Sequence, residues 1–346
     1  MSGGVDSSVA AALLQEQGYQ VRGVMLDLWQ ESEKCQADPE NCPAAAAARV
    51  ARQLGIEFEL RDWKDEFRRR IVDDFTAAYA RGRTPNPCVR CNPEIKFAAL
   101  LQLAAEYGAD YVASGHYVRR LSGDEVELHR GEPRKDQTYF LWRLKRQSLE
   151  SILFPLGELT KAGVRRRAAS LGLASASRAE SQNVCFIPGG LRDFLAPRLE
   201  SRPGPLVDLE TGEVIGEHAG AAFYTVGQRK GLGLWKSHLE RYVVEVRPES
   251  NEVVVGPRQA VMHGGLEAGE LNLLTAKPGD EVEAVVRYRA RPVRARVEEL
   301  DESAGRLRLR FAEPQFAVTP GQSVALYRGT RLLGGAVIAR VLPDQR

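Results

Sequence analysis

Hydrophobic and polar positions follow different spacings in the two halves of the chain. In the first half, short apolar runs typical of strands (residues 21–28, 56–60 and 111–114) alternate with segments whose apolar residues recur every three or four positions, as in a helix. These helical segments are predicted at residues 7–18, 44–54, 66–80, 95–107 and 159–173. The alternation predicts an α/β fold with a doubly wound, mostly parallel sheet, whose ligands bind beyond the carboxyl ends of the strands.

Beyond residue 185 the pattern changes to short strands. Glycine and proline interrupt the chain at residues 188–190 and 202–205, and residues 206–254 read as strands joined by turns. From residue 280 onward the alternation is strongly β, as at Val282, Ala284 and Val286. We therefore expect a small central β-rich domain and a C-terminal β-barrel. The predicted domains are residues 1–192, 193–264 and 265–346.

Composition limits the class of protein. The 346 residues are 43% hydrophobic with a formal net charge of +2, typical of a globular protein of two or three domains. No apolar run approaches the ~18 residues that span a bilayer, so no membrane partner is expected. Five cysteines without a secretory signal favour a reducing cytoplasm, where cysteines are more often catalytic or metal-binding than disulfide-bonded. We expect a cytoplasmic protein.

A glycine-rich segment, S-G-G-V-D-S-S at residues 2–8, runs directly into the first predicted helix. Glycines allow a tight turn, and a helix N-terminus favours phosphate. The segment lacks the Walker A pattern but is similar to the S-G-G-x-D-S loop of the PP-loop ATP pyrophosphatases. Such a loop should follow a buried strand, and only Met1 precedes it here. We therefore expect a first strand to be missing from this sequence and the loop to be less constrained.

The cysteines form a second set of candidates. Cys88 and Cys91 follow a segment with prolines at positions 85 and 87, which fix the backbone in advance. A lone C-x-x-C fits a redox pair, half a zinc site or part of an iron–sulfur site. Cys185, flanked by apolar residues, is by itself typical of a buried structural cysteine. Cys35 and Cys42 are spaced too loosely for a metal site and are interpreted as surface-loop cysteines.

Several motifs occur along the chain in one order. They are S-G-G-V-D-S-S at 2–8, T-P-N-P at 84–87, C-N at 91–92, I-K-F at 95–97, G-H-Y at 115–117, K-D-Q-T-Y-F-L at 135–141, E-S-Q-N-V-C-F-I at 180–187 and G-Q-R-K-G-L-G at 227–233. Taken together, these motifs resemble the tRNA-specific 2-thiouridylases over essentially the whole chain. The resemblance implies that ATP adenylates the C2 oxygen of the wobble uridine in tRNAs for Lys, Glu and Gln, and that sulfur then replaces this oxygen.

The chemistry of this reaction explains the need for two thiols. A uracil carbonyl oxygen leaves poorly until it is joined to AMP, and the sulfur must then arrive as a nucleophile. A cysteine persulfide can carry sulfur, and a second thiol can release it by forming a disulfide. The resemblance implies that Cys91 is the nucleophile and that Cys185 carries the persulfide, supplied by a sulfur-donor protein. Arg90 and Lys96 are the nearby cations expected to lower the thiol pKa values.

One departure from the family pattern leaves a second route open. Many members have Asp where this chain has Cys88. If Cys88, Cys91 and Cys185 converge, three thiolates could hold an iron–sulfur cluster with one open iron, which could deliver hydrosulfide. We favour the persulfide route.

The resemblance also implies the remaining site residues. The ATP site is expected to contain Ser2, Gly3, Gly4, Val5, Asp6, Ser7, Leu26 and Gly115, with Asp6 near the phosphates and a Mg²⁺ ion. The target base is expected to meet Asn86, Pro87 and Cys88. The further tRNA contacts are His116, Lys135, Asp136, Gln137, Arg287, Tyr288 and Gln322.

Residues 287–296 give tRNA binding independent support, because they contain five arginines and one tyrosine and read as a cationic strand pair. Alone, this pattern is more typical of a solvated β face. The target base must also leave its stack to reach ATP. Two other functions stay open: an amide-forming PP-loop ligase, which needs no paired reactive cysteines, and a tRNA-binding module without chemistry.

Overall fold

The structure is a computed structural model, and it describes the chain except for residues 30–41, 179–183, 188, 235–239, 274 and 345–346. It contains two compact units. The first unit comprises Met1–Val72, Cys88–Phe186 and Thr330–Leu332, and the second comprises Asp73–Pro87, Ile187–Gly329 and Leu333–Arg346.

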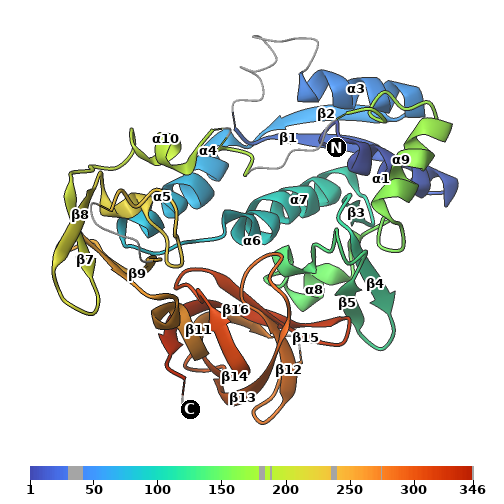
Figure 1. The fold of residues 1–346 in the computed structure, drawn as a ribbon. Helices are drawn as coiled ribbons and strands as arrows, with labels where there is room; N and C mark the ends of the chain where they lie inside the picture. Colours follow the sequence, from blue (N-terminus) through green and yellow to red (C-terminus); the bar gives the residue numbers. More distant parts are fainter. Residues whose placement is uncertain (30–41, 179–183, 188, 235–239, 274, 345–346) are drawn as a thin grey trace. The chain divides into compact units, whose positions relative to one another are not determined.

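The first unit has the predicted α/β pattern. Strand β1 (Arg22–Asp27) pairs in parallel with β2 (Glu57–Asp62), and β3 (Val112–Ala113) pairs in parallel with β6 (Ile152–Leu153). The connection from β1 to β2 passes through α3 (Pro43–Leu54), which packs on both strands. Helix α1 (Val5–Glu16) contacts α3 and α9 (Lys161–Ser170) (Figure 1). One hydrophobic core of the first unit contains Val5 and Val9 of α1 together with Tyr117 and Val164.

Two longer helical stretches each contain a π-helical segment. The first consists of α4 (Lys64–Phe67), η1 (Arg68–Val72) and α5 (Asp73–Ala80). The second consists of α6 (Pro87–Cys91), η2 (Asn92–Phe97) and α7 (Ala98–Tyr107). The helices predicted at residues 66–80 and 95–107 are thus present, with π turns, which are often found at functional sites. The other elements between residues 118 and 195 are β4 (Val118–Ser122), β5 (Val126–Arg130), η3 (Thr138–Phe140), α8 (Arg146–Leu149) and α10 (Leu191–Leu195).

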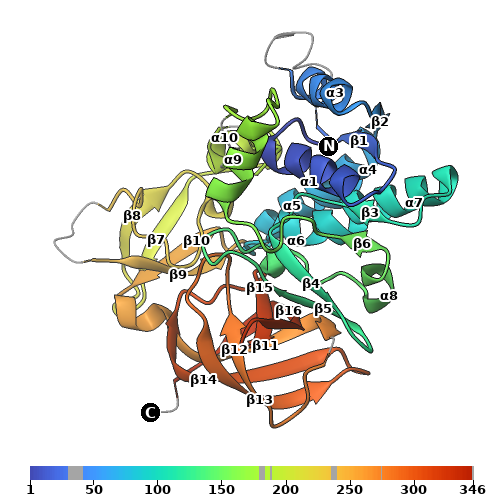
Figure 2. The ribbon, with the colours of Figure 1, turned by 90° about the vertical axis from the view of Figure 1, so that its right-hand side faces the viewer.

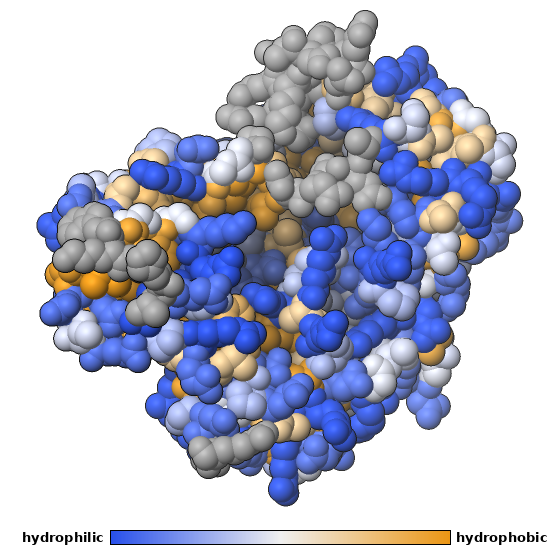
Figure 3. Space-filling view, in the orientation of Figure 1, coloured by the Kyte–Doolittle hydropathy of each residue, from blue (hydrophilic) through white to orange (hydrophobic). Residues whose placement is uncertain are grey.

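The second unit contains a four-stranded sheet in the order β8-β7-β10-β9. Its strands are β7 (Gly204–Asp208), β8 (Val214–His218), β9 (Tyr242–Arg247) and β10 (Glu252–Gly256). The short helix η4 (Ala221–Phe223) lies between β8 and β9 in the chain, and η5 (Arg258–Val261) follows β10. The sheet buries Leu206, Val243 and Val253. Apolar residues are exposed on the left of Figure 3. Among the described residues of this sheet region, Leu209, which follows β7, and Val214 of β8 are exposed large hydrophobic side chains.

The C-terminal strands of this unit form a closed barrel (Figure 2). The order is β11-β14-β13-β12-β15-β16, and β16 pairs back with β11, so the predicted β-barrel is confirmed with six strands. The strands are β11 (Met262–Leu273), β12 (Glu281–Val285), β13 (Val293–Asp301), β14 (Arg306–Phe316), β15 (Ser323–Arg328) and β16 (Arg331–Leu342). On β13, Val293, Ala295 and Val297 point inward while Arg294 and Arg296 are exposed, the alternation expected of a barrel strand.

The interpretation of residues 287–296 as a strand pair is wrong for residues 287–292, while residues 293–296 do lie in a strand that pairs with β12. Strand β12 ends at Val285 and β13 begins at Val293, so Arg287 and Tyr288 lie in the turn between them. The amide of Ala290 donates to the carbonyl of Arg287 at 3.0 Å, and Arg289 has a positive φ of 64°. Pro292 cannot donate to a strand ladder, which explains why β13 starts one residue later.

Replacing Leu326 with alanine is expected to lower the free energy of unfolding by about 2–5 kcal/mol, because a fully buried leucine is lost from the barrel core. Urea unfolding monitored by circular dichroism measures this. The control is Val214→Ala, whose side chain is 55% exposed and whose loss should change the value by less than about 0.5 kcal/mol. Equal effects of the two substitutions would contradict the assigned barrel interior.

No helix among the described residues is both long and apolar enough to cross a membrane.

Candidate active site

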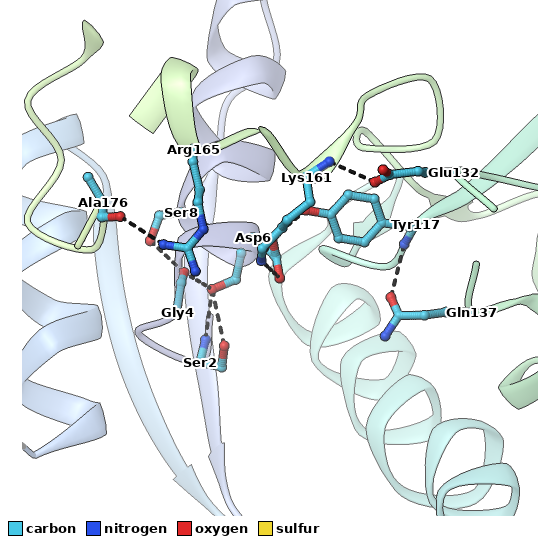
Figure 4. A network of polar contacts seen from close by, with 11 residues as sticks. Ser2, Gly4, Asp6, Ser8, Tyr117, Glu132, Gln137, Lys161, Arg165 and Ala176 are labelled. Atoms are coloured by element: carbon cyan, nitrogen blue, oxygen red, sulfur yellow. Dashed lines mark hydrogen bonds and ion pairs between the residues drawn. The ribbon is translucent and has the colours of Figure 1, made fainter. Parts of the chain in front are cut away.

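The glycine-rich loop is folded against the first turn of α1. Gly3 has a positive φ of 70°, and a Cβ there would lie 2.5 Å from the carbonyl oxygen of Pro43, so only glycine fits. The hydroxyls of Ser7 and Ser8 donate to the carbonyl of Gly4 at 3.1 and 2.9 Å, and the amide of Ser2 donates to Ser7 Oγ at 3.1 Å (Figure 4). The loop therefore ends at a helix N-terminus, whose first N–H groups have no intrahelical acceptor and can bind an anion.

Gly115 lies directly against this loop. A Cβ at this position would be 2.8 Å from the main-chain carbon of Asp6 and 2.9 Å from the amide nitrogen of Ser7. The structure thus brings together the loop and Gly115, which lies two residues after β3, as expected for a shared nucleotide site. Leu26 lies near the carboxyl end of β1. The amino group of Met1 donates to the carbonyl of Val24, so the residue before the loop contacts β1.

Asp6 is held by two residues that the sequence analysis missed. The hydroxyl of Tyr117 donates to Asp6 Oδ1 at 2.6 Å, and Lys161 Nζ donates to both carboxylate oxygens at 2.7 and 2.8 Å (Figure 4). The main-chain N–H of Lys161 donates to Glu132 Oε2 at 2.7 Å. One sequence signal was available: a lysine at the start of a helix opposes the helix dipole, and so suggests another role.

The segment expected to contact tRNA around residue 136 is partly turned into the protein. Gln137 Oε1 accepts from the amide of Tyr117 at 3.0 Å. Asp136 Oδ1 accepts from the amides of Gly131 and Thr138, and burial raises the pKa of this carboxyl group. The amide of Lys135 donates to the carbonyl of Glu132. These contacts fix the segment in the first unit.

Three thiols converge in the first unit. Cys88 is half-buried, Cys91 is buried and Cys185 is exposed. Burial raises the pKa of Cys91 to about 12; Lys96 opposes this rise, while Cys185 and Cys88 add to it. Burial and the charge of Cys185 likewise raise the pKa of Cys88. Cys185 therefore lies close enough to the two cysteines of α6 to raise their pKa values, although 94 positions separate Cys185 from Cys91.

Of the two cations expected to lower the pKa of Cys91, Lys96 does so, but burial raises the pKa by more. Arg90 is engaged by Glu94, with two hydrogen bonds of 3.0 and 2.9 Å. Lys96 is the remaining cation, and its effect is smaller than that of burial. Burial disfavours the charge of Lys96 itself, yet the combined effect of Cys91, Cys88 and Cys185 raises its pKa. Near neutral pH, therefore, Lys96 is protonated and the neighbouring Cys91 is mostly in its thiol form.

His116 lies beside the same lysine. Burial and the charge of Lys96 lower its pKa to about 3, so the ring is neutral at physiological pH. Its Nδ1 lies 2.8 Å from Ser114 Oγ, and its ring contacts those of Phe97 and Phe154. His116, a predicted tRNA contact, is thus a half-buried, neutral histidine in contact with two aromatic rings.

No group of three or more His, Cys, Asp or Glu side chains within the described part of the chain is placed to hold a metal ion. Cys88, Cys91 and Cys185 are therefore not placed to hold a single metal ion together. The oxygens of Asp6, the expected neighbour of magnesium, are in contact with Lys161 and Tyr117.

The remaining predicted tRNA contacts lie in the second unit. Gln322 Nε2 donates to the carbonyl of Thr84 at 2.9 Å, and the amide of Thr84 donates to the carbonyl of Pro320 at 3.1 Å. The turn before β15 thus holds the segment that leads to Asn86 and Pro87. Within this unit, Gln322 therefore fixes the backbone just before Asn86 and Pro87, the residues expected to meet the target base.

Cys42 is not a surface-loop cysteine. It is only 5% exposed and caps α3, where its sulfur accepts from the amide of Ala45 at 3.3 Å. Cys35 and residues 180–183 lie outside the described residues.

Cys185 is expected to react with iodoacetamide long before Cys91. Only the thiolate is alkylated, and burial holds the pKa of Cys91 near 12 while Cys185 is exposed. Between pH 7 and 9.5 the alkylation rate of Cys91 should rise about tenfold per pH unit without a plateau, as measured by peptide mass spectrometry. A plateau below pH 9 would contradict the burial of this thiol.

The loop, the helix that it opens and the parallel strands beside it define an ATP-using α/β domain of the PP-loop class. Family models agree: one described as tRNA methyl transferase HUP domain matches residues 1–189. Models described as tRNA methyl transferase PRC-barrel domain and aminomethyltransferase beta-barrel domain match residues 192–257 and 263–338.

Relatives with curated names cover almost the whole chain. A tRNA-specific 2-thiouridylase MnmA of Thermus thermophilus is 57% identical, over 99% of this chain and 94% of its own. The proteins of the same name from Deinococcus radiodurans and Carboxydothermus hydrogenoformans are 52% and 45% identical, over 98% and 99% of this chain and 91% and 97% of their own. The chain belongs to the MnmA family of tRNA-specific 2-thiouridylases.

A solved structure, the U34-tRNA thiolase NcsA from Methanococcus maripaludis with its [4Fe-4S] cluster, is 21% identical over 57% of this chain and 60% of that chain, with a TM-score of 0.32. At this score the likeness carries no argument.

Proposed function

We propose that this chain is a cytoplasmic tRNA-uridine 2-sulfurtransferase that replaces the C2 oxygen of the wobble uridine of tRNAs for Lys, Glu and Gln with sulfur from a cysteine persulfide, at the expense of ATP. Family membership supports the reaction. One feature supports the cysteine route: the pKa of Cys91 is raised in part by Cys185, within the unit that also contains the glycine-rich loop.

The first step is adenylation. The C2 oxygen of uridine attacks the α-phosphorus of ATP; an O–P bond forms, the bond to the β-phosphate breaks, and pyrophosphate leaves with Mg²⁺. The proposed ATP-binding residues are Ser2, Gly3, Gly4, Val5, Asp6, Ser7, Leu26 and Gly115. The support for the loop is its helix N-terminus, which favours a polyphosphate, together with the contact between Gly115 and Asp6.

The second step transfers sulfur. A donor protein places a sulfane sulfur on Cys185, whose exposure suits this delivery. The Cys91 thiolate attacks Cys185 Sγ, so a Cys91–Cys185 disulfide forms and hydrosulfide leaves with the electron pair of the broken S–S bond. Hydrosulfide adds at C2 and AMP departs with the oxygen. An external thiol reductant then restores both cysteines.

The Cys91 proton must leave before the attack, because its thiol is mostly protonated at neutral pH. Lys96 is the half-buried cation that stabilises the resulting thiolate. Cys91 thus gains nucleophilicity only when its proton is taken, which limits reactions of this buried thiol with other electrophiles.

The tRNA is proposed to contact residues of both units. These are Asn86, Pro87, Cys88, His116, Lys135, Asp136, Gln137, Arg287, Tyr288 and Gln322. The exposed turn between β12 and β13 supports such a role, because the guanidinium of Arg289 lies 5.3 Å from the centre of the Tyr288 ring, as in surfaces that stack on bases. The division into domains at residues 192 and 264 is part of the same proposal.

The experiment is a complete reaction with the full chain, ATP, magnesium, a persulfide donor and unmodified tRNA. Thiouridine is detected by retardation on an organomercury gel, and we expect AMP and thiouridine in equal amounts. AMP formation without tRNA would favour an amide-forming ligase, and tRNA binding without AMP would favour a module that has lost chemistry. Activity only after anaerobic reconstitution with iron would contradict the persulfide route.

A further inference from the structure

An ion pair joins the glycine-rich loop to helix α9, which lies far along the chain. Lys161 and Asp6 are 155 positions apart, and Lys161 Nζ lies 2.7 and 2.8 Å from the two carboxylate oxygens. The Lys161 side chain is 12% exposed and that of Asp6 is 33% exposed. Tyr117 donates a third hydrogen bond to Asp6 at 2.6 Å. Figure 4 shows these side chains meeting beside the loop.

Helix α9 itself does not explain a lysine at this position. Lys161 is the first residue of α9, and Thr160 already caps the helix by accepting from the amide of Gly163 at 3.0 Å. A cation at a helix N-terminus is opposed by the helix dipole, whereas a carboxylate in the first turn, as Asp6 is in α1, is favoured. The position of Lys161 is therefore explained by its contact with Asp6.

This contact matters because Asp6 lies where a polyphosphate is proposed to bind. A carboxylate beside ATP repels its phosphates unless a cation offsets the charge. We propose that Lys161 is a positioning residue that neutralises and orients Asp6, and that this neutralisation lets the glycine-rich loop accept the ATP polyphosphate. The inference rests on the ATP site of the proposed function and gives Lys161 a role through Asp6 rather than a direct contact with phosphate.

The test is ATP binding by the full chain, measured by calorimetry in EDTA and without tRNA. Lys161→Met should weaken binding at least about tenfold, because one uncompensated charge is left beside the phosphates, while Lys161→Arg should stay within about threefold. In the Asp6→Asn background there is no charge to neutralise, so adding Lys161→Met should change the affinity by less than about threefold.

Arg166→Met is the matched control, because it removes one positive charge from an exposed position of the same helix and should leave ATP affinity within about threefold. Thermal unfolding of each variant checks the fold. If Lys161→Met alone fails to fold, the comparison of Asp6→Asn with the double variant still decides. If Lys161→Met weakened ATP binding equally in the unmodified chain and in the Asp6→Asn background, the proposal would be overturned. Because no tRNA or sulfur is present, this result is independent of whether thiolation occurs.

Discussion

Thiolation is expected to fall by more than about 10³-fold in both Cys91→Ser and Cys185→Ser, because a serine hydroxyl can neither attack a persulfide sulfur nor carry one. ATP binding should stay within about twofold in both variants, since neither cysteine lies in the glycine-rich loop. The measurement is the initial rate of thiouridine formation with saturating ATP and tRNA, alongside calorimetry with ATP.

Cys88→Asp separates the two sulfur routes in the same assay. It introduces the residue that many family members have, and with a persulfide on Cys185 it should keep thiolation within about tenfold. Loss of activity as complete as in Cys91→Ser would mean that all three thiols are needed, and would contradict the two-cysteine account.

Gly115→Ala is expected to weaken ATP binding by about 100-fold. Its Cβ would lie 2.8 Å from the main-chain carbon of Asp6 and 2.9 Å from the amide nitrogen of Ser7. Both are backbone atoms, so the first turn of α1 must move, and with it the N–H groups proposed to bind the polyphosphate. Losing one or two hydrogen bonds to a charged group, each worth about 1.5–3 kcal/mol, weakens binding by about two orders of magnitude. Calorimetric titration with ATP measures the loss.

Gly123→Ala is the control for this substitution. A Cβ at Gly123 would meet one atom at 3.9 Å and nothing closer, so ATP affinity and thermal stability should match those of the unmodified chain. An unchanged affinity in Gly115→Ala would mean that Gly115 does not shape the nucleotide site.

The fold was predictable where it depends on local pattern. The change from helical spacing to alternation predicted the α/β region and the β-barrel, because burial on one face enforces the period of a helix or strand. The segment at residues 2–8 predicted a loop at a helix start, and α1 begins at Val5. The contact between this loop and Gly115 also followed, since strand ends of a parallel sheet meet at one edge.

Other features depend on contacts between distant residues. The pairing of Asp6 with Lys161 and Tyr117 involves side chains 155 and 111 positions away, which no local pattern records. The pKa of Cys91 depends on its burial, and charge counting along the sequence overestimated the effect of Arg90. The arginines around position 289 matched a strand pattern, but a positive φ and the nearby proline made a turn.

The most direct test of the account is a single turnover with a persulfide preloaded on Cys185, using ATP and unmodified tRNA under anaerobic, iron-free conditions without reductant. Thiouridine, AMP and the Cys91–Cys185 disulfide are quantified by mass spectrometry. The account predicts that the three products form in equal amounts and at the same rate. Thiouridine formed without that disulfide, or none formed until iron is supplied, would contradict it.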